Sequence, residues 1–190
     1  MIIELESNLI QWAAEVSRRG LPSTRSLKAH YPNTLRSHIV GKLGELAVEM
    51  WATPKFQVDS VFRDPARIAE CDLIIDGLRI DVKTWSESSW VELGRCVRPT
   101  QLASHIRKTD LFLWTHLVEN IDPEKLPCSI QVHLAGTSTI DDVLNAPGWV
   151  LRSLPNRQVG VDEMRPLSFL NSQVRGASPT PPHHQVRHSH

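Results

Sequence analysis

The alternation of apolar and polar residues is clearest in residues 71–85, which read CDLIIDGLRIDVKTW. An Asp-Gly pair at 76–77 divides two runs in which every second residue is apolar: Leu73, Ile75, Leu78, Ile80 and Val82. Alternation of this kind is typical of strands with one buried face. Asp-Gly favours a two-residue type I′ turn, because both central residues of that turn need a positive φ. The pattern therefore predicts a β-hairpin with its turn at Asp76-Gly77.

A two-residue turn also fixes the register of the hairpin. It places Ile75 opposite Leu78, Leu73 opposite Ile80, and Asp72 opposite Asp81. The two carboxylates would share one face with their Cβ atoms roughly 5 Å apart, and Lys83 would point to that face as well. Like charges so close repel each other, and a shared divalent cation beside an ammonium group removes the repulsion. The alternative is that Asp-x-Lys simply forms the wet face of a strand, which is common.

Periodicity elsewhere predicts an α/β fold. We expect helices over 2–19, 36–52 and about 99–108, a short helix starting near Thr139, and strands over 56–63, 110–118 and 129–135. The segment 85–89 reads as a turn, 90–97 as a short strand or loop, and the turn-rich segment after Gly148 as a closing flap. We expect a single domain over 1–175 with its core at about 36–145. The Pro-, Ser- and His-rich residues 176–190 are expected to be disordered.

The helix predicted over 36–52 carries a carboxylate away from its apolar stripe. The stripe consists of Ile39, Leu43, Leu46, Ala47 and Met50, whereas Glu45 lies on another side near Gly41. Gly41 and Gly44 each cost about 1 kcal/mol relative to Ala inside a helix, which suggests that another part of the chain approaches the backbone closely. Glu45 could then reach a metal site on the sheet. The alternative is an ordinary exposed glutamate.

Charge restricts how the chain could bind nucleic acid. The 190 residues carry a formal net charge of zero with histidine neutral, so only a local basic patch could attract a polyanion. No acidic residue occurs between Glu15 and Glu45, and this interval holds the candidate phosphate-contacting residues Arg25, Lys28, Arg36 and Lys42. A solvated connecting loop is the alternative explanation.

Cysteine usage and hydropathy indicate the environment. Cys71, Cys96 and Cys128 are widely spaced, which favours neither a disulfide framework nor a zinc site and fits a reducing cytoplasm. The sequence starts MIIELESN without a signal-peptide pattern, and no apolar run is long enough to span a membrane. We expect a cytoplasmic protein without a membrane partner.

The order of these elements resembles the PD-(D/E)XK nuclease superfamily over about residues 36–118. The likeness rests on a helix with Glu45 in GKLGELA, a strand, a hairpin with Asp72 and Asp81-Val82-Lys83, a helix and an apolar strand. It implies a restriction-endonuclease-like αβββαβ core, with a mixed central sheet flanked by helices. It also implies that Asp72 and Asp81 bind Mg²⁺, which Mn²⁺ can replace, that Glu45 assists them, and that Lys83 activates or orients the attacking water.

Two departures from the family pattern stand out. Cys71 occupies the position of the proline that gives the superfamily its name. The downstream Gln-x-x-x-Tyr of the exonuclease-like branch is also absent, and Gln101 is the candidate helper in the following helix.

The resemblance implies a Mg²⁺-dependent endodeoxyribonuclease that hydrolyses DNA phosphodiester bonds through a Glu/Asp/Asp-x-Lys site. A non-cutting nucleic-acid-binding module with a nuclease fold is the alternative, and an RNA-directed hydrolase is a third reading. The subfamily stays open between junction resolvases, restriction or homing enzymes, and phage or repair nucleases. A cut through both strands would need a homodimer, since one active site cuts one strand.

Overall fold

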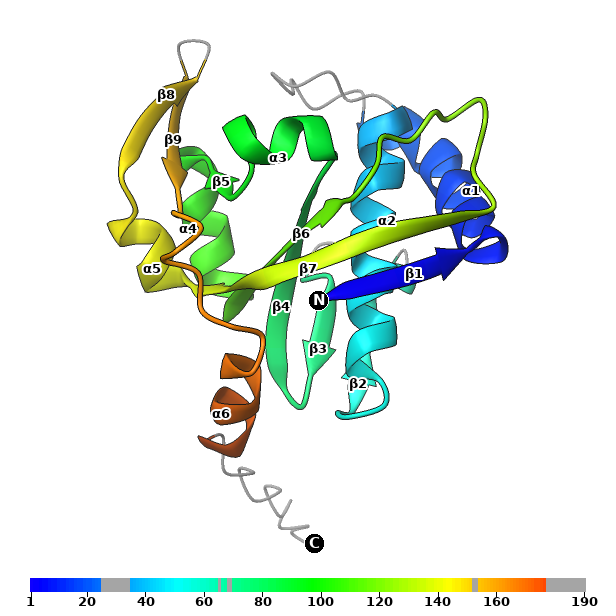
Figure 1. Cartoon of the computed structure of the whole chain (residues 1–190). Helices are drawn as coiled ribbons and strands as arrows, with labels where there is room; N and C mark the ends of the chain where they lie inside the picture. The colour runs from blue at the N-terminus through cyan, green and yellow to red at the C-terminus, as the bar shows by residue number, and fades with distance from the viewer. Residues whose placement is uncertain (25–34, 65, 68–69, 152–153, 177–190) are drawn as a thin grey trace, which may run out of the picture.

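The protein is built around a mixed six-stranded sheet flanked by helices, as the computed structural model shows for residues 1–24, 35–64, 66–67, 70–151 and 154–176 (Figure 1). The strand order is β1-β7-β6-β4-β3-β2. The strands are β1 (Ile2–Glu6), β2 (Val58–Asp59), β3 (Leu73–Ile75), β4 (Leu78–Trp85), β6 (Leu111–Leu117) and β7 (Ser129–Thr139). Strands β4 and β6 are parallel, and the other neighbours are antiparallel. The predicted α/β class with a mixed central sheet is confirmed.

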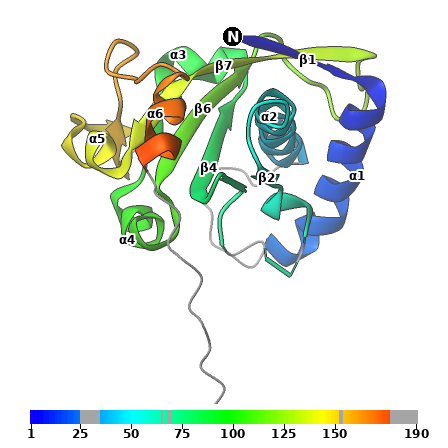
Figure 2. The same ribbon diagram turned by 90° about the horizontal axis from the view of Figure 1, so that it is seen from below.

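Helices cover both faces of this sheet. Figure 2 shows α1 (Ser7–Thr24) and α2 (Leu35–Ala52) on one side of β4, with α4 (Pro99–Lys108) and α5 (Ile140–Asn145) on the other. The remaining elements are η1 (Val61–Arg63), α3 (Glu87–Leu93), α6 (Phe169–Gly176) and a small sheet of β5 (Cys96–Val97), β9 (Leu154–Gln158) and β8 (Gly148–Leu151). Among the described residues, no helix is both long and apolar enough to cross a bilayer.

Two hydrophobic cores lie on the two faces of the sheet. Leu111 and Leu113 of β6 belong to the core beneath α1 and α2, whereas Phe112 and Trp114 belong to the core near α4 and α5. All four side chains are almost fully buried. Burial on both faces therefore explains the continuous apolar run of this strand, a pattern typical of strands covered on both sides.

The central hairpin forms as predicted. Asp76 and Gly77 adopt φ values of 45° and 87°, as a type I′ turn requires, and Ile75 pairs with Leu78 and Leu73 with Ile80. The ladder ends at that last pair. Beyond it the Asp72 N–H donates to the Ile80 carbonyl at 3.0 Å, so the expected direct pairing of Asp72 with Asp81 is not part of the ladder.

The helix predicted over 2–19 is wrong for its first residues. Residues 2–6 form β1, which pairs with β7 through contacts such as Leu5 opposite Ile130, and the helix occupies Ser7–Thr24. Pairing with β7 buries Leu5 completely and gives backbone groups of both strands hydrogen-bond partners. Local periodicity does not reveal this pairing. The helix also runs past Gly20 and Pro22, although these two residue types predict that it ends there.

Smaller corrections concern segments whose pattern was ambiguous. The strand predicted over 56–63 shortens to Val58–Asp59 followed by η1, and the segment predicted as turn and strand after Trp85 contains α3. Met50, assigned to the buried stripe of its helix, is 42% exposed. Ile106 is 49% exposed, although its helical spacing from Leu102 predicts that both residues face inward. The helix near Thr139 is confirmed, and its Asp142 completes a capping box and pairs with Arg165. The expected flap contains β8, β9 and α6, and the tail from 177 lies outside the described residues.

Gly44 lets α2 lie directly against the sheet. A Cβ built on Gly44 would meet the Oγ1 atoms of Thr84 and Thr115 at 1.9 and 2.7 Å, whereas one on Gly41 would meet nothing within 4 Å. The close approach expected from the two glycines is thus present at Gly44 and absent at Gly41.

The two glycines form a matched pair for substitution. We expect Gly44→Ala to lower the free energy of unfolding by about 1–3 kcal/mol through overpacking. Gly41→Ala is expected to raise it by up to about 1 kcal/mol through helix propensity. Urea unfolding followed by circular dichroism measures both, and equal effects of the two substitutions would contradict the close contact at Gly44.

Candidate active site

Three carboxyl groups gather where α2 meets the hairpin. Glu45 follows Gly44 on α2, Asp72 precedes β3, and Asp81 lies in β4. Glu45 and Asp81 are only 8% and 6% exposed, and Asp72 is partly buried. Because Gly44 has no side chain, α2 comes close enough to the sheet for the next residue to join the two aspartates.

Donors from the same elements hold these carboxylates. Lys83 Nζ lies 2.6 Å from Asp81 Oδ1, and Lys42 Nζ lies 2.5 Å from Glu45 Oε2. The backbone N–H of Val82 donates to Asp72 Oδ2 at 2.7 Å. The site is therefore a compact cluster of opposite charges in which most groups are shielded from water.

Burial and mutual repulsion make it unfavourable for all three carboxyl groups to be ionised at the same time. The pKa of Glu45 is raised to about 8, mainly by burial and then by the charge of Asp72, while Lys42 offsets only part of this rise. Burial and the charge of Asp81 likewise raise the pKa of Asp72. Carboxyl groups that raise one another's pKa in this way form an environment that attracts a cation.

Asp81 and Lys83 behave as a charged pair. Burial alone would raise the pKa of Asp81, but Lys83 and His105 outweigh it, so the pKa lies below its usual value. Burial alone would lower the pKa of Lys83, but Asp81 and Asp72 outweigh it and raise the pKa. Lys83 is therefore an ammonium group at neutral pH, able to donate hydrogen bonds but not to accept a proton.

His105 is the member of the site that sequence reasoning missed. It lies in α4, is 7% exposed, and places Nδ1 2.6 Å from Asp81 Oδ2. The two atoms lie at ion-pair distance, although the contact lacks the geometry of a hydrogen bond. The signal was available in the spacing, because Leu102 and His105 lie three residues apart and share the buried side of α4.

A cleft opens beside this cluster with a volume of about 680 Å³. Lys83 lies in its wall, and so do two residues singled out from the sequence, Arg36 and Gln101. The third described candidate, Lys42, is instead paired with Glu45 inside the cluster. The predicted phosphate contacts Arg25 and Lys28 lie outside the described residues.

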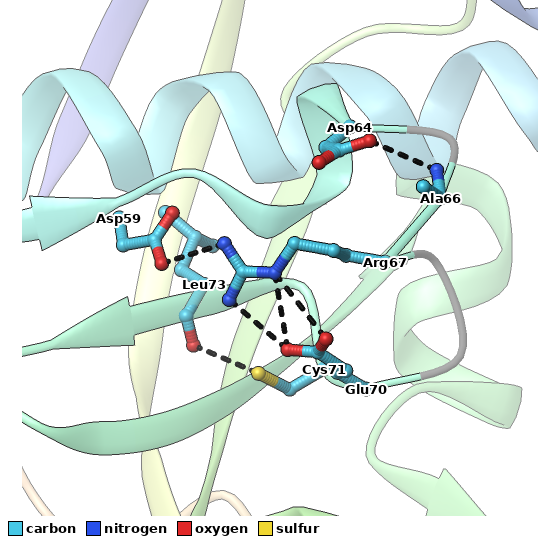
Figure 3. A network of polar contacts seen from close by, with 7 residues as sticks. All are labelled: Asp59, Asp64, Ala66, Arg67, Glu70, Cys71 and Leu73. Atoms are coloured by element: carbon cyan, nitrogen blue, oxygen red, sulfur yellow. Dashed lines mark hydrogen bonds and ion pairs between the residues drawn. The ribbon is translucent and has the colours of Figure 1, made fainter.

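A polar network supports the segment that leads into Asp72 (Figure 3). Arg67 pairs with Asp59 at 2.8 Å and with Glu70 at 3.0 Å, joining the end of β2 to the approach to β3. Next to Glu70, Cys71 donates from Sγ to the Leu73 carbonyl at 3.4 Å. Cys71 thus has a local hydrogen-bond partner in the segment next to Asp72.

The donor chemistry of the cluster suits Mg²⁺, which prefers oxygen ligands and retains several waters. The carboxyl groups of Asp72, Asp81 and Glu45 offer oxygen ligands. The pKa values of Glu45 and Asp72 are raised, which fits a site that attracts a cation. Both oxygens of Asp81 already have a neighbour: Oδ1 contacts Lys83 and Oδ2 contacts His105. Within the described part of the chain, no three His, Cys, Asp or Glu side chains are arranged to hold a metal ion.

Comparison with models of known protein families, with curated proteins and with solved structures found no match to this chain. Indications of function therefore come from the residues of the cluster and from the cleft beside it.

Proposed function

We propose that this protein is a Mg²⁺-dependent endonuclease that hydrolyses DNA phosphodiester bonds through a site of the PD-(D/E)XK type. The observation that carries the proposal is the gathering of Glu45, Asp72 and Asp81 with Lys83 beside an open cleft. With η1, α3 and β5 as insertions, the order α2, β2, β3, β4, α4, β6 is compatible with the αβββαβ arrangement of that superfamily, which supports the same proposal.

In this proposal, Asp72 and Asp81 hold Mg²⁺ with the assistance of Glu45. The ion would supply positive charge to stabilise the charge that develops on the phosphate. Lys83 lies in the cleft wall as an ammonium group, so it orients the attacking water and donates to a phosphate oxygen. The Lys83 contact keeps Asp81 ionised and therefore ready to bind a cation.

The direct test is cleavage by the purified protein. Supercoiled plasmid and, separately, a four-way junction are incubated in Mg²⁺ and in EDTA. Nicking or resolution in Mg²⁺ alone is expected, and the preferred substrate would indicate the subfamily. A homodimer remains the prediction for a cut through both strands, and analytical ultracentrifugation tests it.

His105 is expected to act as a positioning residue for Asp81. We expect His105→Ala to lower activity or apparent Mg²⁺ affinity by about 10- to 100-fold, because the carboxylate loses the partner that fixes one of its oxygens. Cleavage rates measured over a Mg²⁺ titration should show a raised half-saturating concentration that His105→Asn partly restores.

Ser104→Ala is the matched control, since Ser104 is an exposed neighbour on the same helix. Thermal unfolding of each variant separates positioning from a loss of fold. An unchanged Mg²⁺ requirement in folded His105→Ala would exclude this role.

A non-cutting nucleic-acid-binding module is the second candidate. One observation favours this candidate: Lys83 and His105 already contact the two oxygens of Asp81, so the carboxylate has partners without a metal. Such a protein would bind plasmid or junction DNA and give no product in Mg²⁺ or Mn²⁺.

A further inference from the structure

The cleft beside Lys83 has features that the hydrolytic cluster does not use. Trp85 and Gln101 line it together with the arginines Arg36 and Arg98. Trp85 follows Lys83 by two residues along β4, so the strand that carries the reacting groups continues directly into this cleft. A ligand in the cleft would therefore lie next to the scissile bond.

The ring of Trp85 packs against two other tryptophan rings. Its ring lies 6.0 Å from that of Trp90 and 5.8 Å from that of Trp114, and Trp114 is fully buried. A supported aromatic ring in a polar cleft is suited to stacking on a nucleobase, since every base presents a π face. Guanidinium groups suit phosphates and base planes, and the Gln101 amide suits base edges.

The size of the cleft favours nucleotides over a duplex. Its volume of about 680 Å³ lies within the range of about 300–1,000 Å³ for sites that enclose small ligands. Duplex DNA is bound across broad surfaces of about 1,000–2,500 Å². Paired bases also present only their edges, so they could not stack on Trp85.

We propose that this cleft binds unpaired nucleotides of one strand, so that the substrate class is DNA with unpaired bases next to the cut rather than intact duplex. The inference rests on the proposed nuclease function for its link to cleavage. The binding itself can be measured without cleavage.

The test measures fluorescence anisotropy in EDTA with a short labelled oligothymidine and with the same strand annealed as a blunt duplex. Wild type is expected to bind the single strand at least about 10-fold more tightly. Trp85→Ala should weaken single-strand binding by about 5- to 150-fold, the range for losing one stacked base, and Trp85→Phe should retain most of it.

Gln101→Ala provides a variant that should fold without difficulty, because Gln101 is exposed, and we expect about 5-fold weaker binding. Lys55→Ala removes an exposed residue that is not part of the cleft lining and should leave binding unchanged. Thymidine monophosphate is added as a competitor to distinguish a strand from a free nucleotide.

Three results would overturn the inference: equal affinity for the duplex, unchanged single-strand binding in both Trp85→Ala and Gln101→Ala, or a monophosphate that binds as tightly as the oligonucleotide. These results differ from a failure of the nuclease proposal. Single-strand binding that depends on the cleft, without cleavage in Mg²⁺, would support the binding proposal and contradict the nuclease proposal. Cleavage restricted to intact duplex would support the nuclease proposal and contradict the binding proposal.

Discussion

Replacing Lys83 with alanine is expected to lower the rate of Mg²⁺-dependent DNA cleavage by about 10²- to 10⁴-fold. Lys83 is the ammonium group that joins the carboxylate cluster to the cleft, and it contacts Asp81 at 2.6 Å. Its loss removes the donor for the attacking water and the phosphate. The fold should persist, because the Lys83 side chain is 29% exposed and Asp81 keeps its contact with His105. Initial rates of plasmid nicking measure the effect.

Lys55→Ala is the control that matches this substitution in chemistry, since it removes a lysine away from the site and should nick at the wild-type rate. Asp81→Asn should abolish cleavage as well. It is a harsher change, because Lys83 loses its counter-charge and His105 loses its carboxylate partner, and the cost approaches that of breaking a buried pair, about 3–5 kcal/mol. Wild-type cleavage by both folded variants, Lys83→Ala and Asp81→Asn, would remove the site assignment.

The hairpin could be predicted from the sequence because its determinants are local. Asp76-Gly77 fixes the turn and alternation fixes which residues face each other, so the placement of Asp81 and Lys83 on one strand follows from a few neighbouring residues. The proximity of Glu45 was anticipated from Gly44, whose missing side chain admits Thr84 and Thr115. Local chemistry therefore indicated most of the candidate cluster.

Features that depend on distant partners could not be predicted. Residues 2–6 carry a pattern that fits a helix end or a short strand, and the choice is made by β7, more than a hundred residues later. His105 was missed for a related reason. Its role depends on the way α4 packs on the sheet, and the expected inward residue Ile106 is exposed while His105 reaches Asp81.

Stability in the absence of a metal should fall as the pH rises from about 5 to 8, and Glu45→Gln should remove most of that fall. The pKa of Glu45 is raised from 4.5 to about 8, mainly by burial and then by Asp72. Between those values the folded state holds a proton that the unfolded state has lost, so raising the pH favours unfolding. At about 1.36 kcal/mol per pKa unit, the full effect is on the order of 5 kcal/mol. Urea unfolding in EDTA at pH 6 and pH 8 measures the part of this effect that falls between those two values, on the order of 2 kcal/mol.

Glu49→Gln, one turn further along α2, should change stability in the opposite direction. Burial would raise the pKa of Glu49, but hydrogen bonds from Arg63 and Ser60 outweigh it and lower the pKa. Its ionised form therefore stabilises the fold above the pKa of the unfolded state, and that contribution is lost only when the pH falls into the acid range. At pH 8 we expect Glu45→Gln to be more stable than wild type and Glu49→Gln to be less stable.

Mg²⁺ should reduce the pH dependence of wild type, because a cation offsets the charge that ionised Glu45 adds to Asp72 and Asp81. A wild-type stability that is flat between pH 6 and 8 in EDTA would contradict the raised pKa assigned to Glu45.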